Sequence, residues 1–240
     1  MFDMVFIQPG TFMMGSPESE KWRWSEEILH QVTITKPFYL GKYLVTQAQW
    51  RAVMGDNPSH FKGDNLPVET VSWDDCQEFL KKLNDNAKNV TFRLPTEAEW
   101  EYACRAGTTT PFHFGSVCDG RQANCDGNHP YGTNNKGPYL KKTSAVGSYA
   151  PNAWGLYDMH GNVFEWCSDW YGDYPNRAVT DPTGPRNGSF RVSRGVCWLV
   201  PAANSRAAYR YRFSPSYRDL STGFRLAMTA RSKKSKLVKK

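Results

Sequence analysis

The stretch Asn152-Ala153-Trp154-Gly155-Leu156-Tyr157-Asp158-Met159-His160-Gly161-Asn162-Val163-Phe164-Glu165-Trp166 is typical of the second half of the chain. Gly, Asn and Asp, the residues that turns require, interrupt the apolar pieces every few positions. Neither a helical nor a strand periodicity is therefore sustained over a long run. The same pattern holds from about residue 108 onward. We therefore predict turns and short strands here instead of regular helices.

Regular elements are expected earlier in the chain. The apolar runs at 4–7 and 11–15 flank Gln8-Pro9-Gly10 and predict two strands, and 30–44 predicts two more, divided by Lys36-Pro37. Three pairs of residues have the spacing of a helix N-cap and its third helical residue: Thr46 with Gln49, Ser72 with Asp75, and Thr96 with Glu99. They predict helices near 47–54, 73–84 and 97–105. Short helices beside short strands indicate one α+β domain.

Composition limits the class of protein. The chain has 240 residues, 14% of them aromatic, and can bury a core without disulfides. Its net charge of +7 owes much to the tail 231–240, which carries six positive charges and no acid. We expect this tail to be disordered, with an anionic or nucleic-acid contact as the lesser alternative. No apolar run is long enough to span a membrane. No signal peptide precedes residue 4, so a surface or secreted location would require a leader removed earlier, and a cytoplasmic one stays open.

The six cysteines form no Cys-x-x-Cys pair, which argues against a zinc site or a thioredoxin-like motif. They are Cys76, Cys104, Cys118, Cys125, Cys167 and Cys197. The first two fall on apolar faces of predicted helices, so we expect them to be buried thiols.

Five motifs, in order, carry a resemblance. They are Ile7-Gln8-Pro9-Gly10-Thr11-Phe12-Met13-Met14-Gly15-Ser16; Pro67-Val68-Glu69-Thr70-Val71-Ser72-Trp73; Arg93-Leu94-Pro95-Thr96-Glu97-Ala98-Glu99-Trp100-Glu101-Tyr102-Ala103; the stretch 152–166; and Gly223-Phe224-Arg225-Leu226. This series resembles the formylglycine-generating enzyme family, also called the sulfatase-modifying factor domain, over about 4–228. The resemblance implies a single domain over 1–230 with a variant of the C-type lectin fold.

The family enzyme binds copper(I) through two cysteines that precede the closing Gly-Phe-Arg motif. Here the corresponding segment, 194–210, holds only Cys197, which stands where the family has Ser. We therefore expect no copper and no catalytic residue. Cys197 as a lone nucleophile stays open, although no His lies near it in sequence to activate it. Iron enzymes of the family need a His cluster from an extra domain, and the five histidines here show no paired spacing.

The resemblance also implies a structural calcium site. Its ligands would be the side chains of Asp158 and Glu165 and the carbonyls of Gly161 and Val163, which suits an ion that prefers several oxygen ligands. The alternative is that Glu165 pairs with a buried Arg while Asp158 caps a turn. A second calcium site of the enzyme, near Asn124 and 135–139, is not predicted because Lys136 stands where an acidic ligand would help.

Residues 191–225 have an unusual composition. They contain no Lys, Glu, Gln or Met, types that are common elsewhere in the chain, yet they are rich in Arg, Tyr, Ser and Ala. Diversity-generating retroelements leave this signature, because randomising the first two bases of Asn codons cannot produce those four residue types. Proteins diversified in this way often use this fold, and the chain resembles one of them. The alternative is an ordinary family member whose segment happens to lack these residues.

The hypothesis makes a specific prediction about exposure. A surface that tolerates substitution must contribute little to folding, so its side chains should face solvent above a buried, fixed layer. The fixed layer would contain Trp198, Arg206, Arg210 and Phe224. An ordinary member would instead bury most of Val196, Leu199, Val200 and Phe213. The predicted ligand-binding residues are Val196, Cys197, Leu199, Val200, Tyr209, Tyr211, Phe213, Ser216 and Tyr217.

Three functions follow as hypotheses. The first is a non-catalytic, receptor-like protein that binds an unknown protein or cell-surface ligand through a diversified surface, because exposed apolar and aromatic patches mark protein interfaces. The second is a formylglycine-type oxidase, and the third is a catalytically silent accessory member of the family. We expect a monomer with no nucleic-acid partner.

Overall fold

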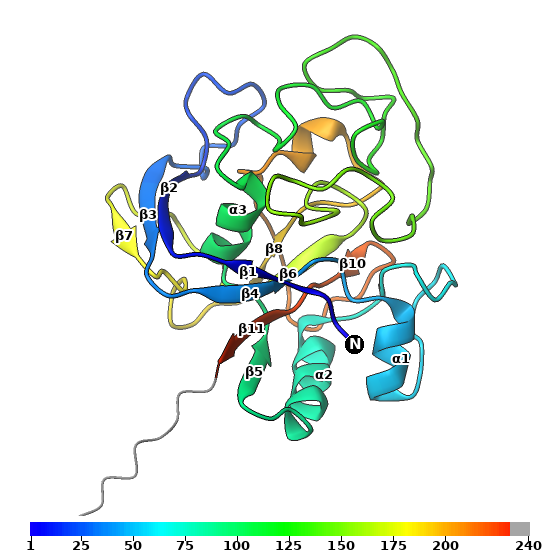
Figure 1. Ribbon diagram of the computed structural model, residues 1–240. Coiled ribbons are helices and arrows are strands. Elements are labelled where there is room, and N and C mark those ends of the chain that lie inside the picture. The colour runs from blue at the N-terminus through cyan, green and yellow to red at the C-terminus, as the bar shows by residue number, and fades with distance from the viewer. Residues whose placement is uncertain (231–240) are drawn as a thin grey trace, which may run out of the picture.

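The computed structural model describes residues 1–230, which combine α-helices with short strands in three sheets (Figure 1). The predicted tail, 231–240, lies outside the described residues. The helices are α1 (Gln47–Met54), α2 (Trp73–Asp85), α3 (Glu97–Arg105) and the 3-10 turn η1 (Ala202–Ser205). The strands are β1 (Met4–Ile7), β2 (Gly10–Met14), β3 (His30–Ile34), β4 (Phe38–Gly41), β5 (Val90–Arg93), β6 (Phe164–Trp170), β7 (Val179–Thr180), β8 (Arg191–Arg194), β9 (Tyr211–Phe213), β10 (Thr222–Gly223) and β11 (Ala227–Ala230).

The three predicted helices are confirmed, and each begins with a capping box. Thr46, Ser72 and Thr96 accept a hydrogen bond from the third helical N–H, and that residue's side chain accepts one from the cap's own N–H. We expected this return contact only in α1 and α3, but Asp75 makes it in α2 as well. These contacts satisfy N–H groups that a helix start would otherwise leave without partners.

The sheets join distant parts of the chain. The first has the strand order β1-β4-β11-β5, the second β10-β6-β8-β9, and the third β2-β3-β7. The first two strands of the chain thus belong to different sheets, since β1 pairs with β4 while β2 pairs with β3. Almost nothing regular lies between α3 and β6 beyond isolated bridges, as the turn-rich sequence predicts. In Figure 1 these loops (green to yellow-green) lie at the top with η1 (orange).

Helix α3 is the central helix. All nine of its residues are buried, and its Trp100 packs in the largest hydrophobic cluster with β2, β3 and β4 residues such as Met14, Val32 and Leu40. Three carboxylates of α3, from Glu97, Glu99 and Glu101, are also buried and all are paired with arginines. The interior of the fold thus contains ion pairs that join α3 to other parts of the chain. Within the described residues, no helix is long and apolar enough to cross a membrane.

Candidate ligand-binding surface

Residues 191–225 supply three strands of the second sheet, β8, β9 and β10, and the loop that connects β8 to β9. Strand β9 lies at the sheet edge, antiparallel to β8, with Tyr211 opposite Ser193 and Phe213 opposite Arg191. Between these strands the chain leaves the sheet, forms η1 and returns. A connection of this kind needs support from beneath, since loops rarely bury their own backbone polar groups.

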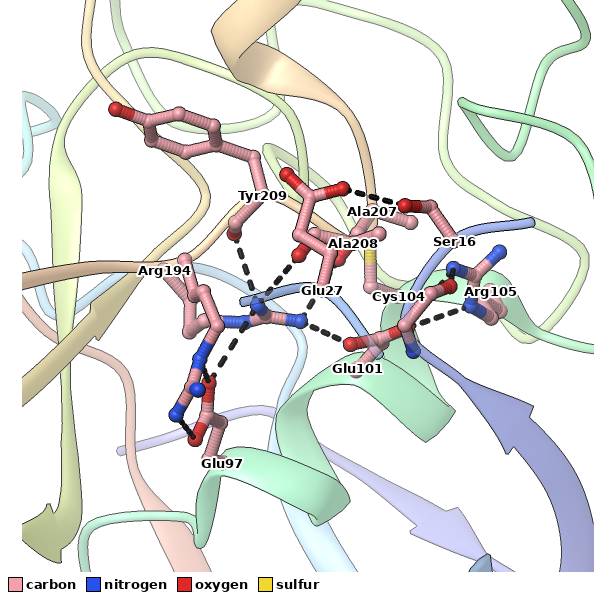
Figure 2. A network of polar contacts seen from close by, with 12 residues as sticks. Ser16, Glu27, Glu97, Glu101, Cys104, Arg105, Arg194, Ala207, Ala208 and Tyr209 are labelled. Atoms are coloured by element: carbon pink, nitrogen blue, oxygen red, sulfur yellow. Dashed lines mark hydrogen bonds and ion pairs between the residues drawn. The ribbon is translucent and has the colours of Figure 1, made fainter. Parts of the chain in front are cut away.

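Arg194 supplies much of that support. Its guanidinium, fully buried, donates hydrogen bonds to the carbonyls of Ala207 at 2.8 Å, Ala208 at 3.1 Å and Tyr209 at 2.9 Å. The same group forms an ion pair with Glu101, whose other oxygen accepts from Arg105. Figure 2 shows the guanidinium between the α3 carboxylates and the backbone of 207–209. Arg194 therefore fixes the end of the loop to the helix.

Arg206 and Arg210 repeat this arrangement on either side. Arg206 binds both oxygens of Glu27, at 2.7 and 2.8 Å, and reaches Glu20 at 2.6 Å. Arg210 binds both oxygens of Glu97, at 2.9 and 2.7 Å. The neighbouring carboxylate of Glu97 holds the pKa of Arg210 above its usual range despite burial, which disfavours the charged form. The prediction that Arg206, Arg210, Trp198 and Phe224 are buried is confirmed.

Above this layer, part of the predicted surface faces solvent. Leu199, Tyr211 and Tyr217 are 46%, 40% and 37% exposed, and Ser216 is exposed too. Val200 and Phe213 are half-buried. Of the four apolar residues that an ordinary member would bury, only one, Val196, is buried. The exposure criterion therefore does not exclude the diversified-surface hypothesis.

Three of the predicted surface residues are buried, and for them the prediction of exposure is wrong. Val196, Cys197 and Tyr209 pack with Phe164 and Trp198 in a small hydrophobic cluster. Val196 has a left-handed backbone (φ 64°), rare for a β-branched residue, which turns the chain inward as it leaves β8. Tyr209 is held through its carbonyl by Arg194, and its ring lies against that of Trp24. The composition of the segment carries no information on these orientations.

Aromatic side chains of β9 and its flanking residues form a row, in which Tyr211 and Tyr217 are exposed. The ring of Tyr211 lies 6.3 Å from that of Tyr209 and 4.9 Å from that of Phe213, which stacks on Tyr217 at 4.5 Å. Phe164 supports the row from beneath, at 5.6 Å from Tyr211 and 5.3 Å from Phe213. Contacts of this kind hold large side chains in place before any ligand arrives.

The row ends in a hollow of about 290 Å³, and the sequence did not predict that a hollow lies there. Trp24 and Phe190, which are 54% and 45% exposed, line it together with Tyr171 and Tyr211. Arg212 also lines it, with its guanidinium 4.6 Å from the Tyr171 ring. Glu26 lines the same hollow, but no ion pair joins a carboxylate to Arg212 within residues 1–230. The only available signal was the presence of two tryptophans, Trp22 and Trp24, in an otherwise polar loop.

Comparison with known proteins identifies the family to which this fold belongs. The sequence model of the sulfatase-modifying factor enzyme 1-like domain matches residues 1–230. The chain belongs to this family. Its fold is the C-type-lectin-like fold of mixed helix and sheet that the sequence resemblance implied.

Relatives in the family include proteins of different kinds. The chain is 32% identical to "Chaperone protein LppX" of Paenibacillus barcinonensis, covering 93% of this chain and 88% of that protein. It is 35% identical to the formylglycine-generating enzyme of Streptomyces coelicolor, covering 96% and 68%. Among solved structures, "Treponema denticola variable protein 1" superposes with a TM-score of 0.82 at 30% identity, covering 94% of each chain. The family thus includes relatives named as an enzyme and relatives that are not.

The lone thiol of the family's catalytic segment is poorly placed for nucleophilic chemistry. Cys197 is 1% exposed, and burial raises the pKa of its thiol to about 12. A nucleophilic cysteine needs a thiolate near neutral pH, and this thiol is protonated there. The negative charge of Asp219 contributes to this pKa shift in the same direction.

Both carboxylates of the predicted calcium site are buried and already partly engaged. Glu165 accepts from Arg225 through both oxygens and from the indole N–H of Trp100 at 2.9 Å, as the alternative to calcium predicted. Oδ2 of Asp158 accepts from the N–H of Gly147 at 2.8 Å, whereas Oδ1 is buried without a hydrogen bond. Burial, and to a smaller extent the nearby Glu165 carboxylate, raises the pKa of Asp158 to about 6. An unpaired buried carboxylate oxygen beside a second carboxylate fits a hard cation.

Proposed function

We propose that this chain is a non-catalytic member of the family that binds a protein ligand through a surface diversified in the gene. The observation that carries the proposal is the division of residues 191–225 into two layers. The side chains of Leu199, Tyr211, Ser216 and Tyr217 face solvent, while buried arginines hold the backbone below them. Stability and recognition thus depend on different residues of one segment.

The chemistry of the surface favours a protein as the ligand. The aromatic row and the hollow beside it offer Trp, Tyr and Phe rings together with Arg212, the residue types that dominate protein interfaces. Tyr gives a large contact area while freezing few torsions. Similarity to a protein named as a variable protein supports the diversified reading. A surface or secreted location agrees with this role.

A substitution library tests the proposal. Leu199, Tyr211, Ser216 and Tyr217 are randomised together, and folded members are counted by protease resistance and melting temperature. Most members should fold with melting temperatures within a few degrees of the wild type, since exposed positions contribute little to stability. The matched control randomises the buried Val196, Cys197 and Tyr209, and most of its members should fail to fold.

Two outcomes would contradict the proposal. If the exposed library unfolds as often as the buried one, the segment is an ordinary structural part of a silent family member. If the gene's 3′ flank holds no near-identical repeat that differs only at adenines, beside a reverse transcriptase, the surface is not diversified by this route.

We further propose that the protein holds a structural calcium ion between Asp158, Glu165 and the carbonyls of Gly161 and Val163. The unpaired Oδ1 of Asp158 supports this proposal. Oε1 of Glu165 accepts a single hydrogen bond, which leaves a lone pair for a metal. Bound there, the ion would compensate the negative charge of two buried carboxylates. It would not take part in ligand binding. No copper site is proposed, because Cys197 lacks a second thiolate in its segment.

A further inference from the structure

Two of the six cysteines face each other. The sulfurs of Cys118 and Cys125 lie 3.8 Å apart, and both residues are buried, at 0% and 1% exposure. Their surroundings are apolar, formed by Phe112, Ala123 and Tyr131 together with Ala202 of η1. Within residues 1–230 no other pair of cysteines is in contact. These two thiols therefore differ from the other four, none of which contacts another cysteine within residues 1–230.

The backbone around the pair is already fixed by other contacts. Cys118 exchanges two hydrogen bonds with Tyr131, at 3.0 and 2.7 Å. Inside the 118–125 loop, the N–H of Asp119 donates to the Gln122 side chain and the N–H of Arg121 donates to the Asp119 carboxylate. A disulfide requires its sulfurs about 2 Å apart. Side-chain rotation can supply the remaining approach, because the loop holds the two residues together without the bond.

We propose that Cys118 and Cys125 form a disulfide bond that closes this loop. The oxidant is a low-molecular-weight disulfide such as oxidised glutathione. A thiolate of one cysteine attacks a glutathione sulfur, forming a mixed disulfide and releasing one reduced glutathione. The second cysteine, on losing its proton, attacks the first cysteine's sulfur and releases the other glutathione. Two cysteine thiols and one disulfide thus become one protein disulfide and two thiols.

Either cysteine can make the first attack, since either sulfur can donate the hydrogen bond that joins them. Since both sulfurs are buried in the folded chain, the exchange belongs to folding, before the apolar cluster closes over them.

The bond would also support the proposed ligand surface. The N–H of Asp126, next to Cys125, donates to the carbonyl of Val200 at 2.9 Å, and the N–H of Ala202 donates to the carbonyl of His129 at 3.1 Å. Residues 200–202 are thus hydrogen-bonded to the segment 126–129, which directly follows the loop between the two cysteines. This consequence depends on the proposed function, whereas the bond itself does not.

Peptide mapping of the full chain tests the bond directly. The denatured, reduced protein is refolded with reduced and oxidised glutathione, denatured again, alkylated with iodoacetamide and digested with trypsin. Arg121 lies between the two cysteines, so cleavage there leaves them on separate peptides joined only by the disulfide. The expected product is this linked pair, with the other four cysteines alkylated. Six alkylated cysteines, or a different pairing, would overturn the proposal.

A stability measurement gives a second, independent readout. Dithiothreitol should lower the melting temperature of the refolded wild type by roughly 5 °C, since a short closed loop restricts the unfolded chain. In the double variant Cys118→Ala/Cys125→Ala it should have no effect. An equal response of both proteins to dithiothreitol would count against the bond. If the double variant does not fold, the peptide map of the wild type still decides the question, and neither result bears on ligand binding.

Discussion

Asp158 is a buried carboxylate with one oxygen that lacks a hydrogen bond. It adopts a left-handed backbone (φ 57°) in a turn that also contains Gly161 and Asn162 in left-handed conformations. The turn directs the carboxylate inward, where the N–H of Gly147 donates to one oxygen and no group of residues 1–230 donates to the other. A buried carboxylate normally has a partner, because desolvation without one costs free energy.

Removing calcium should therefore destabilise the protein. We expect a chelator to lower the melting temperature of the wild type, because a ligand that binds only the folded state stabilises it by about 3 kcal/mol at a hundredfold excess over its Kd. Differential scanning fluorimetry with and without the chelator provides the measurement. Asp158→Asn should melt at the same temperature in both conditions. Asp181→Asn is the matched control, since Asp181 is also left-handed but exposed, and it should keep the response. An unchanged wild type would remove the calcium proposal.

At the scale of the element, strand β9 places two arginines in opposite environments. Arg210, just before the strand, is buried and binds both oxygens of Glu97. Arg212, within it, is exposed and lies over the rings of Tyr171 and Phe190, and it forms no ion pair with the described part of the chain. The same residue type thus serves as an anchor at one position and as a candidate contact two residues later.

The two arginines should respond differently to truncation. Arg210→Ala leaves Glu97 buried without its bidentate partner and should lower the free energy of unfolding by about 3–5 kcal/mol. Arg212→Ala should change it by less than about 1 kcal/mol, because the side chain is exposed. Urea denaturation of both variants measures the difference. Equal losses would mean that Arg212 is structural, which would remove it from the proposed surface.

The elements differ in how far sequence could predict them. The boundaries of α1 and α3 were predicted to the residue, because capping boxes act over three or four neighbouring positions. The inward turn of Val196 was not predicted, since it depends on a left-handed backbone and on packing against Phe164 from another strand. The contribution of Trp24 and Phe190 to the hollow was missed for the same reason, because tertiary contacts bring these distant residues together.

The whole molecule combines a family fold with a catalytic segment that has only one cysteine. We expect the protein not to convert a sulfatase-type cysteine peptide to formylglycine, with or without added copper(I). The physical reason is that Cys197 is buried, protonated near neutral pH and without a second thiolate in its segment. Mass spectrometry of the incubated peptide measures conversion, with the Streptomyces coelicolor relative as the positive control. Turnover that disappears in Cys197→Ser would show that the chain is an oxidase.

The hydrogen bonds from Arg194 to the backbone at 207, 208 and 209 have a consequence for inheritance. Every amino acid carries the same main-chain carbonyl. A guanidinium that donates hydrogen bonds to carbonyls therefore binds them whatever side chain the residue has. Of the three, only position 209 is among the predicted variable residues, and its side chain is buried, yet its attachment to Arg194 does not require tyrosine. The codons of neighbouring exposed residues could therefore change from one generation to the next, while the attachment of the loop backbone to Arg194 stays the same.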